Sequence, residues 1–539
     1  MNITFQPLSG YAYGAIQPSI GISFSAPFHV STKLRLSLEV LCDQVAVLRR
    51  SGSNSPNDAD TGSDLLPDLI VRTTDHLSAL AGDQRFTATT WMKEGETLQC
   101  VIPTLSPTLI TWLVRTVLNE IGKRSEALSK HDCQQFIAFL TKKARPYLPA
   151  GTNASSLIQS AAERRIPFKI FDRKLLILGY GAGTHILNSS LTDDESINAV
   201  SMAKDKVTTN QFLSLSLSGF PVAQQAIVNS CSEALSFAER NGYPIVLKPR
   251  AEEQGRGVHT FLNSAQEVSD AYEVLKADYK RIIAEKHYFG DGYRVYVLDG
   301  QVVRVRKLSA AHVVGDGVQT VSQLIELENT NPKRGAIYAS IKQIVVDDDV
   351  LSLLKKQSKS LSSIPDKDEK VLLSPTSNLS RGGTSEDYLD QLHPANSKLS
   401  IDVSKAMGLK CSGVDLISID ASKPWQENNA IVCEVNAQPQ IGSVGRVDMH
   451  DMIIDRAGIE MLPVRLFIGP EGNQTSVPLF DRSQSRLDVH VTAKSILASG
   501  SPVQYFDQLT IDPNLPADQI KRLNQLLVSV RSISRPMTT

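Results

Sequence analysis

The amino-acid sequence predicts an α/β (α+β) fold, because helical and strand patterns alternate regularly from about residue 196 onward. Apolar runs at residues 245–249 and 281–285 are bounded by turn or polar residues, which is typical of short buried strands. Residues 232–241 and 265–277 have the spacing and length of helices, and they alternate with those strands. An alternation of this kind indicates a sheet that is buried against helices.

The first part of the chain, residues 1–170, is predicted to be an N-terminal α/β domain whose role the sequence does not specify. Residues 105–140 have helical periodicity, and residues 52–64, rich in Ser, Asn, Asp and Gly, are expected to form a loop or a disordered insert. A strand at residues 168–178 runs into the string Gly179-Tyr180-Gly181-Ala182-Gly183. Such a turn can cradle phosphate, but no βαβ pattern follows, so a plain tight turn is expected.

Two further elements are predicted ahead of the chemistry-bearing strands. Residues 197–216 are expected to form one helix, with Asp205-Lys206 near its centre. Asp299-Gly300 separates two β-rich runs, residues 293–298 and 301–305, and predicts a hairpin.

Residues 335–394 are expected to be an excursion from this pattern, with a helix at about residues 350–359. A turn-rich piece follows it and ends in the string Asn378-Leu379-Ser380-Arg381-Gly382-Gly383-Thr384. A helix at residues 393–408 then leads into the strand that carries Asp415.

Composition sets mild bounds on function. The 539 residues suffice for about three or four domains, and 41% hydrophobic and 21% charged residues are typical of a globular protein. A formal net charge of -1 predicts no bulk attraction to nucleic acid or to a membrane surface. No apolar run is long enough to span a bilayer, and the N-terminus lacks the pattern of a secretion signal. The six cysteines form no Cys-x-x-Cys pair, so a reducing cytoplasm is the expected compartment.

The strongest candidate for a metal site lies in the last third of the chain. Residues 411–417 and 430–434 are predicted to be strands, and they carry Asp415 and Glu434, with Asn436 just beyond. On neighbouring antiparallel strands these three side chains would present hard oxygen atoms to one point, which suits Mg²⁺. Taken alone, two ordinary strands with polar ends would be the better explanation, but features that suit phosphate binding precede the pair.

Two features that suit phosphate precede this pair. Lys248 ends an apolar strand, from which its ammonium group can reach a phosphate as a compact charge. Gly255-Arg256-Gly257 follows, and backbone N–H groups in such a turn can approach phosphate oxygens closely. A surface lysine followed by an ordinary turn is the alternative.

Polar residues on the next strands complete the candidate site. Glu285 and its neighbour Lys286 end a strand, where a carboxylate can accept a ribose hydroxyl; a solvated charge is the alternative. Arg294, Arg304 and Arg306 lie in the hairpin, and Arg304 and Arg306 share one face of their strand. An arginine-rich face suits a triphosphate or an acyl phosphate, although charged edge strands are also common.

Taken in order, these pieces resemble the ATP-grasp ligases, and most of all the ATP-grasp region of cyanophycin synthetases, followed by the glutathione-forming fusion ligases. The resemblance runs from about residue 175 to 445. It is carried by residues 203–206, 242–249, 255–258, 311–317, 378–384, 413–415 and 434–436.

The resemblance implies an ATP-grasp fold with ATP and Mg²⁺ as cofactors. It implies that Lys206 and Lys248 hold the ATP phosphates under a flap at residues 255–257, and that Glu285 and Lys286 line the adenosine pocket. Other implied roles are metal binding for Asp415, Glu434 and Asn436, contact with the transferring phosphoryl group for Arg294, and a substrate-side loop that includes Asn378, Ser380, Gly382 and Gly383.

The resemblance also implies a division of the chain. An ATP-grasp module is expected at residues 171–455, in parts at 196–330, 336–395 and 396–455, with a small C-terminal extension at residues 456–539. Cyanophycin synthetases carry a Mur-ligase-like domain with a phosphate loop; here residues 469–475 have that outline without its lysine, and either a vestige or a plain loop explains them. Glu253-Gln254 also departs from the Asn-His that relatives often carry in the flap.

The sequence therefore predicts a cytoplasmic carbon–nitrogen ligase. It would join a small-molecule carboxylate to an amine through an acyl phosphate, and the resemblance implies a homo-oligomer. An ATP-grasp phosphotransferase and a non-catalytic nucleotide-binding protein are the alternatives.

Overall fold

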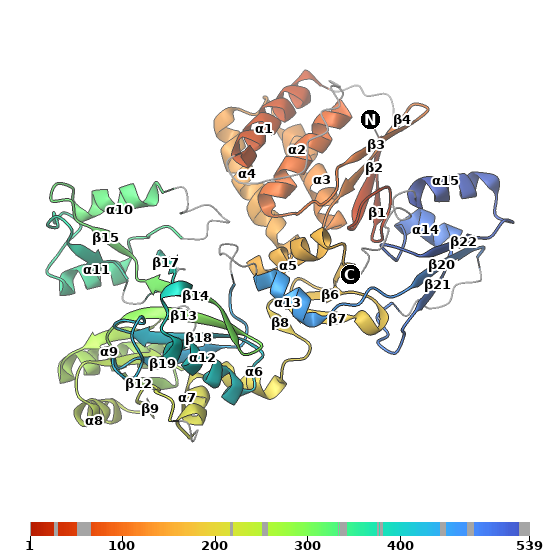
Figure 1. Cartoon of the computed structure of the whole chain (residues 1–539). Coiled ribbons are helices and arrows are strands. Elements are labelled where there is room, and N and C mark those ends of the chain that lie inside the picture. Colours follow the sequence, from red (N-terminus) through yellow and green to blue (C-terminus); the bar gives the residue numbers. More distant parts are fainter. Residues whose placement is uncertain are drawn as a thin grey trace. The chain divides into compact units, whose positions relative to one another are not determined.

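The computed structural model consists of two compact units of chain (Figure 1). The first unit contains Met1–Asp193 together with His450–Thr539, and the second contains Asp194–Met449. The residues that the structure describes are 2–25, 31–50, 66–215, 219–250, 257–331, 334, 342–374, 377, 381–441, 449–471 and 479–527. Over these ranges, no helix has both the length and the apolar character needed to cross a bilayer.

The first unit opens with a four-stranded antiparallel sheet in the order β1-β2-β4-β3. Figure 1 shows helices α1, α2, α3 and α4 gathered on one side of this sheet. Alternate residues of the central strands, such as Ile20, Ile22 and Phe24, are fully buried, as expected for a sheet with one covered face. The elements are β1 Asn2–Leu8, β2 Ser19–Ser25, α1 Thr32–Arg50, α2 Leu66–Ala81, β3 Thr90–Glu94, β4 Thr97–Pro103, α3 Pro107–Lys123 and α4 Lys130–Ala144.

A second small antiparallel sheet and a parallel sheet complete the first unit. The parallel sheet has the order β21-β20-β22, and its apolar face shares one core with Leu8, Tyr11 and Tyr180 from the beginning of the chain. Residues 1–193 and 450–539 therefore form one body. The elements are α5 Thr152–Glu163, β5 Phe168–Ile170, β6 Leu175–Leu178, β7 His185–Asn188, β8 Leu191–Thr192, α13 Met449–Ala457, β20 Val464–Gly469, β21 Leu487–Thr492, α14 Ala493–Ser499, β22 Gln508–Ile511 and α15 Ala517–Leu527.

The described part of the second unit contains two larger antiparallel sheets and a third of only two strands, at residues 312–314 and 370–372. A four-stranded sheet has the order β11-β10-β12-β9, and helices α8 and α9 share its core. A five-stranded sheet has the order β17-β14-β13-β18-β19. The elements are α6 Ile197–Ala203, α7 Lys206–Leu215, β9 Gln225–Val228, α8 Cys231–Asn241, β10 Ile245–Pro249, β11 His259–Leu262, α9 Ala265–Asp278, β12 Ile282–Lys286, β13 Asp291–Leu298, β14 Gln301–Ser309, β17 Thr384–Asp387, α12 Pro394–Met407, β18 Cys411–Ser418 and β19 Ile431–Asn436.

A lobe with a core of its own, which we call the excursion lobe, overlaps the predicted excursion at residues 335–394 but begins before it, and β17 at the end of the predicted range belongs to the five-stranded sheet instead. It contains β15 His312–Val314, α10 Val321–Asn329, α11 Asp348–Lys356 and β16 Lys370–Leu372. Its buried core includes Val313, Ile325, Leu354 and Val371.

The mixture of helices with small, mostly antiparallel sheets confirms the predicted α/β (α+β) class. The contact-defined boundaries lie at residues 193–194 and 449–450, while the domain division drawn from the resemblance stays a prediction. The glycine string at residues 179–183 forms a short 3₁₀ turn that leads into β7, so the expectation of a plain turn is confirmed.

One predicted helix is wrong in its extent. Residues 197–216 do not form a continuous helix, because α6 ends at Ala203 and α7 begins at Lys206. The Asp205 carboxylate accepts hydrogen bonds from the N–H groups of Val207 (2.9 Å) and Thr208 (3.2 Å), so it caps a new helix. Lys206 therefore stands at a helix start rather than at a helix centre.

Candidate active site

Four charged side chains lie in one lateral row across the five-stranded sheet. Arg306 on β14 opposes Arg294 on β13, which opposes Asp415 on β18, and Asp415 in turn opposes Glu434 on β19. Directly opposed residues of antiparallel strands point to the same face. The predicted pairing of the strands that carry Asp415 and Glu434 is confirmed, and the pairing brings two cations and two carboxylates onto one surface.

Asp415 is held by a two-point ion pair. The Nε and Nη2 atoms of Arg294 lie 2.7 Å from Oδ1 and Oδ2 of Asp415 respectively, and Asn436 Nδ2 donates to Oδ2 at 3.2 Å. The Asp415 carboxylate raises the pKa of Arg294 above its ordinary value, so the guanidinium stays charged. The fork of an arginine matches a carboxylate in this geometry and fixes its orientation.

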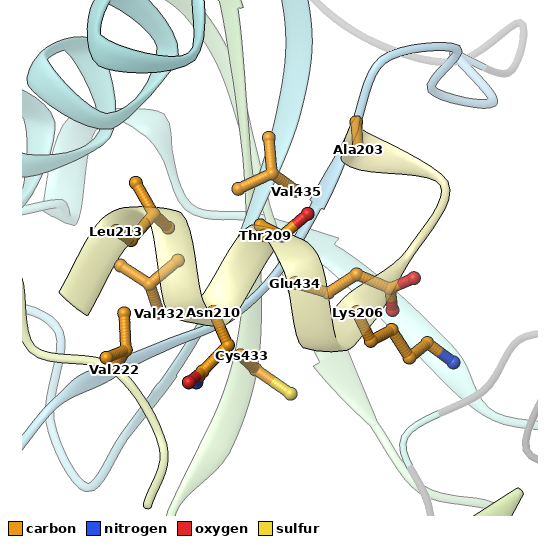
Figure 2. Close-up of a pocket in the computed structure, with 10 residues that line it drawn as sticks. All are labelled: Ala203, Lys206, Thr209, Asn210, Leu213, Val222, Val432, Cys433, Glu434 and Val435. Atoms are coloured by element: carbon orange, nitrogen blue, oxygen red, sulfur yellow. The ribbon is translucent and has the colours of Figure 1, made fainter. Parts of the chain in front are cut away.

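Glu434 lies beside the start of α7. Burial raises the pKa of Glu434, while the positive charge of Lys206 opposes that rise. Figure 2 shows the side chains of Lys206 and Glu434 extending in the same direction from the pocket that they line with Asn210 and Cys433. The pocket has only about 10 Å³ of space for water, so it holds about one water molecule rather than a nucleotide.

A bulge in β19 gives Glu434 this position. The register between β18 and β19 shifts between Asp415 and Leu416, so that Leu416 opposes Val432 and Cys433 is left unopposed. Such an extra residue re-aims neighbouring side chains. Burial raises the pKa of the Cys433 thiol to about 12, so this thiol is a neutral part of the pocket wall.

Lys248 and Glu285 form a second, more deeply buried ion pair. The Lys248 Nζ atom lies 2.7 Å from Glu285 Oε2, and the two side chains are 11% and 8% exposed. Burial is the largest single influence and lowers the pKa of Lys248, but nearby groups, Glu285 foremost and Glu434 among the others, together raise the pKa above its ordinary value. The sequence assigned the two residues to separate parts of the nucleotide site, and it gave no signal that they pair.

The three arginines of the hairpin have different surroundings. Arg304 is 5% exposed and donates through Nη1 to the carbonyl of Ile441 at 2.7 Å. Arg306 donates to the carbonyl of Ser385 on β17 at 3.2 Å. Arg304 lies opposite Tyr296, whose hydroxyl donates to the carbonyl of Gln440 at 2.8 Å. Arg304 and Tyr296 thus hold the segment that follows β19, and sequence reasoning missed Tyr296.

Several predicted site residues lie outside the described part of the chain, namely Gly255, Arg256, Asn378 and Ser380. Gly257, Gly382 and Gly383 are described at the edges of the same two segments. Lys286 ends β12, where its backbone N–H donates to the carbonyl of Gln224 at 2.9 Å.

The side chains of the row fit a magnesium ion that also binds phosphate. In the described ranges, no group of three or more His, Cys, Asp or Glu side chains could hold a metal ion by itself. Mg²⁺, however, commonly takes one or two carboxylates and keeps its other positions for water and phosphate. The raised pKa of Glu434 shows a half-buried carboxylate that a cation would stabilise, and Asn436 adds an amide oxygen nearby.

Comparison with known proteins agrees with this geometry. Residues 318–457 match the model of the RimK-like ATP-grasp domain. The chain is 36% identical to the cyanophycin synthetase of Nostoc sp. (strain PCC 7120 / SAG 25.82 / UTEX 2576) over 294 residues, which is 54% of this chain and 32% of that protein. It is 30% identical over 332 residues to the glutathione biosynthesis bifunctional protein GshAB of Mannheimia succiniciproducens, covering 60% of this chain and 42% of that protein.

The chain thus spans about a third of the length of the cyanophycin synthetases that it matches. Among solved structures, the bifunctional glutathione synthetase of Pasteurella multocida aligns with 82% of this chain and 81% of its own, at 17% identity and a TM-score of 0.44. Residues 318–457 are thus similar to the RimK-like ATP-grasp domain, and somewhat more than half of the chain is similar to cyanophycin synthetases and to GshAB proteins.

Proposed function

We propose that this protein is an ATP- and Mg²⁺-dependent ligase that joins a carboxylate to an amine through an acyl phosphate. The observation that carries the proposal is the row of Arg294, Asp415 and Glu434, with Lys206 beside it. Cations and metal-binding carboxylates on one face are the requirement of phosphoryl transfer, whose loose transition state needs positioning and charge neutralisation more than covalent groups.

In this proposal Lys206 and Lys248 bind the phosphates of ATP. Asp415, Glu434 and Asn436 would hold Mg²⁺, which, when bound, neutralises charge on the phosphate oxygens. A substrate carboxylate attacks the γ-phosphorus, and ADP leaves with the electron pair of the broken bond. Arg294 faces the transferred phosphoryl group, and an amine then displaces phosphate from the acyl phosphate to give an amide.

The matched relatives suggest the substrate class. One group is named for cyanophycin synthesis and the other for glutathione biosynthesis. We therefore infer that the carboxylate and the amine belong to amino acids, short peptides or amino-acid-like metabolites.

The same reading carries expectations about partners and compartment. The near-zero net charge supports small-molecule rather than nucleic-acid or membrane partners. All six cysteines are free thiols, which supports a cytoplasmic location. A homo-oligomer is the assembly we expect, and light scattering during size-exclusion chromatography tests it.

The first experiment measures ADP and phosphate release across a matrix of amino acids and dipeptides, with mass spectrometry of the products. Release that needs both an acid and an amine, with a product lighter by one water than their sum, supports the ligase. Release with a stable phosphorylated product supports a phosphotransferase instead. Tight ATP binding with no turnover across the matrix supports a non-catalytic nucleotide-binding protein.

A further inference from the structure

The described end of the substrate-side loop, Arg381 to Gly383, is fastened to the excursion lobe by three kinds of contact. This segment, which we call the loop arm, leads directly into strand β17. The contacts come from Arg334, from Ile344, and from Asp347 with Asp349. None of these residues was singled out by the sequence.

Arg334 makes the most buried of these contacts. Its side chain is 1% exposed, and its Nη1 atom donates to the carbonyl of Gly382 at 2.7 Å and to the carbonyl of Lys342 at 3.1 Å. Its Nη2 atom lies 2.8 Å from Oε1 of Glu328, at the end of α10. A single buried guanidinium thus joins α10, the backbone of Lys342 and the loop arm. Charged hydrogen bonds of this kind are stronger than neutral ones.

Ile344 packs closely against the backbone of the loop arm. Gly382 has a φ of +84°, and a Cβ atom placed on it would lie 2.9 Å from Cγ1 and 3.2 Å from Cα of Ile344. Ile344 is itself fixed, because its N–H donates to Oδ1 of Asn329 and its carbonyl accepts from Nδ2 of Asn329, both at 2.9 Å. The arm therefore approaches the lobe more closely than any side chain at residue 382 would allow.

Arg381 supplies the third contact at the surface of the lobe. Its Nη2 atom lies 3.0 Å from Oδ2 of Asp347 and 2.7 Å from Oδ2 of Asp349. Asp347 also caps α11, since its Oδ1 accepts the N–H of Val350 at 3.0 Å. These carboxylates are 47% and 65% exposed, so solvent screens this pair far more than it screens Arg334.

The C-terminal end of the loop arm leads into the five-stranded sheet that carries the candidate site. Strand β17 pairs with β14, with Ser385 opposite Leu308 and Asp387 opposite Arg306. Arg306 donates to the carbonyl of Ser385 and opposes Arg294 of the charged row. A shift of the loop arm would therefore displace Ser385, two residues after the arm ends, at the edge of the sheet that carries the candidate site.

We propose that Arg334 is a positioning residue. By holding the backbone of Gly382 to the excursion lobe, it fixes the position of the loop arm relative to the five-stranded sheet. The inference rests on the proposed ligase function for its kinetic meaning. Its contacts are with Glu328, Lys342 and Gly382, so in this proposal it acts through the loop arm. The excursion lobe thereby supports the described end of the substrate-side loop.

The kinetic consequence is selective. Lys206, Lys248 and the metal-binding side chains lie on α7, β10, β18 and β19, none of which Arg334 contacts in the described structure. Loss of the Arg334 guanidinium should raise KM for the acid or the amine by roughly tenfold or more and leave KM for ATP within about twofold.

The test compares Arg334→Met with Arg381→Met and with Arg240→Met in the full chain. Arg240 is an exposed residue of α8 that donates to the carbonyl of Ser236 within its own helix, so it controls for loss of a surface arginine. The kinetic readout is steady-state ADP release with the acid–amine pair found in the matrix experiment. The second readout, which needs no substrate, is hydrogen exchange at the amides of residues 382–386.

Faster exchange at residues 382–386 in Arg334→Met, with unchanged exchange in β18 and β19, is expected together with the selective rise in KM. Arg381→Met should show both effects more weakly, and Arg240→Met neither. Unchanged exchange in the arm of folded Arg334→Met would overturn the positioning role. Equal rises in KM for ATP and for the other substrates would reduce it to a general structural role.

If the proposed ligase function is wrong, the two readouts give a different combination of results. If the wild-type protein ligates nothing but Arg334→Met still loosens residues 382–386, the anchoring stands and the ligase assignment falls. If Arg334→Met does not fold, Arg334→Lys keeps the charge with fewer donors, and it should show an intermediate exchange rate. Wild-type exchange in Arg334→Lys would then count against the guanidinium contacts.

Discussion

At the scale of single residues, Glu434 is a carboxylate whose charged form is disfavoured by its surroundings in the folded chain. Burial raises its pKa, so removal of the carboxylate should not destabilise the fold. We expect Glu434→Ala to lower ATP turnover by roughly 100-fold or more while the melting temperature stays the same or rises. Glu273→Ala, at a well-exposed position of α9, is the matched control. A folded Glu434→Ala protein with near-normal turnover would remove the metal assignment.

Arg294 neutralises Asp415 in the absence of a metal, which leads to a second prediction at the same scale. Arg294→Met should abolish turnover but tighten the binding of Mn²⁺ measured without nucleotide, because Asp415 loses its competing cation. Electron paramagnetic resonance of free Mn²⁺ gives this affinity directly. Arg294→Lys keeps a positive charge and should bind Mn²⁺ about as the wild type does. Weaker Mn²⁺ binding by Arg294→Met would show that Arg294 supports the cation site instead of competing with it.

At the scale of elements, the break between α6 and α7 sets the place of Lys206. Asp205 caps α7 and also accepts a hydrogen bond from Arg250 Nε at 3.1 Å. Asp205→Ala should destabilise the second unit by about 1 kcal/mol or more and raise KM for ATP, whereas Asp205→Asn should keep most of the cap. Thermal unfolding and nucleotide titration of the two variants measure both effects. An unchanged KM for ATP in Asp205→Ala would separate the cap from the placement of Lys206.

The Asp205 cap also has a defined pH dependence. Although burial acts to raise the pKa of Asp205, the Arg250 guanidinium and the backbone N–H groups lower it below its ordinary value. A carboxyl with a lowered folded-state pKa stabilises the fold above its unfolded-state pKa of about 3.9. That contribution is lost as the pH falls through the lower folded-state value, so Asp205→Ala and the wild type should converge in stability in strong acid.

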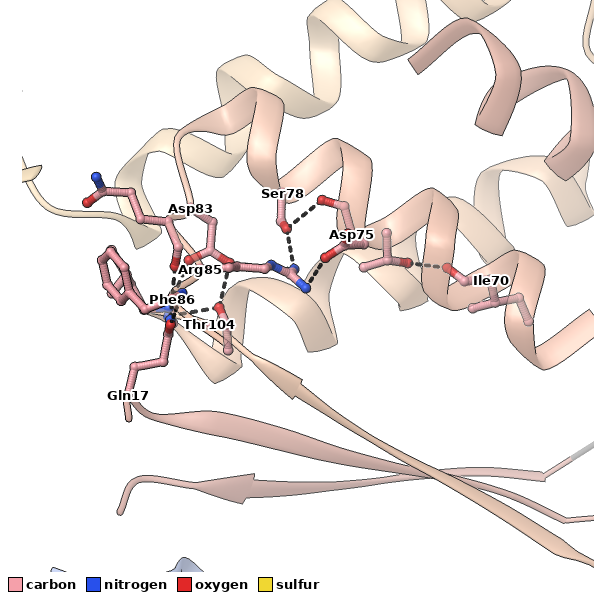
Figure 3. Close-up of polar contacts among 12 residues, drawn as sticks. Gln17, Ile70, Asp75, Ser78, Asp83, Arg85, Phe86 and Thr104 are labelled. Atoms are coloured by element: carbon pink, nitrogen blue, oxygen red, sulfur yellow. Dashed lines mark hydrogen bonds and ion pairs between the residues drawn. The ribbon is translucent and has the colours of Figure 1, made fainter. Parts of the chain in front are cut away.

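At the scale of the whole molecule, the first unit contains a buried carboxyl that has no part in the candidate site. Figure 3 shows Asp83 within a polar cluster between α2 and the loop before α3, where Thr104 Oγ1 donates to it at 2.6 Å and the N–H of Leu105 at 2.8 Å. In the same cluster Arg85 donates to Ser78 Oγ at 2.7 Å and pairs with Asp75. Burial raises the pKa of Asp83 to about 7.

A raised folded-state pKa means that the folded unit holds a proton which the unfolded chain has released. The stability from Asp83 is thus full below about pH 4 and declines as the pH rises towards 7. Asp83→Asn should remove this decline and raise the melting temperature relative to wild type more at pH 8 than at pH 5. Asp43→Asn, at an exposed site in α1, is the control. Fluorescence in a Trp425→Phe background reports the first unit through Trp91 and Trp112, and equal shifts at both pH values would contradict the assignment.

The sequence was sufficient to predict the order of helices and strands and the pairing of the two strands that carry Asp415 and Glu434. It was not sufficient to predict contacts between distant segments. Asp415 and Glu434 could be placed together because both lie in short apolar runs, and the phosphate-type features that precede them favoured a shared site over two unrelated strands. The pairing of Lys248 with Glu285, and of Arg334 with Gly382, depends on how elements pack, which periodicity does not encode. The predicted helix at residues 197–216 was too long because an aspartate such as Asp205 can lie inside a helix or cap the start of a new one. The spacing of apolar residues does not distinguish these two positions.

The shared core of the first unit has a consequence for biosynthesis. Leu8 and Tyr11 pack with Leu466, Val489 and Leu523, and Tyr11 pairs with Ser501 through the backbone. A ribosome therefore synthesises all of residues 194–449 before the C-terminal core partners of Leu8 and Tyr11 exist. During synthesis the second unit can therefore fold before the core of the first unit is complete, and a nascent chain from which residues 194–449 have fully emerged should already bind nucleotide.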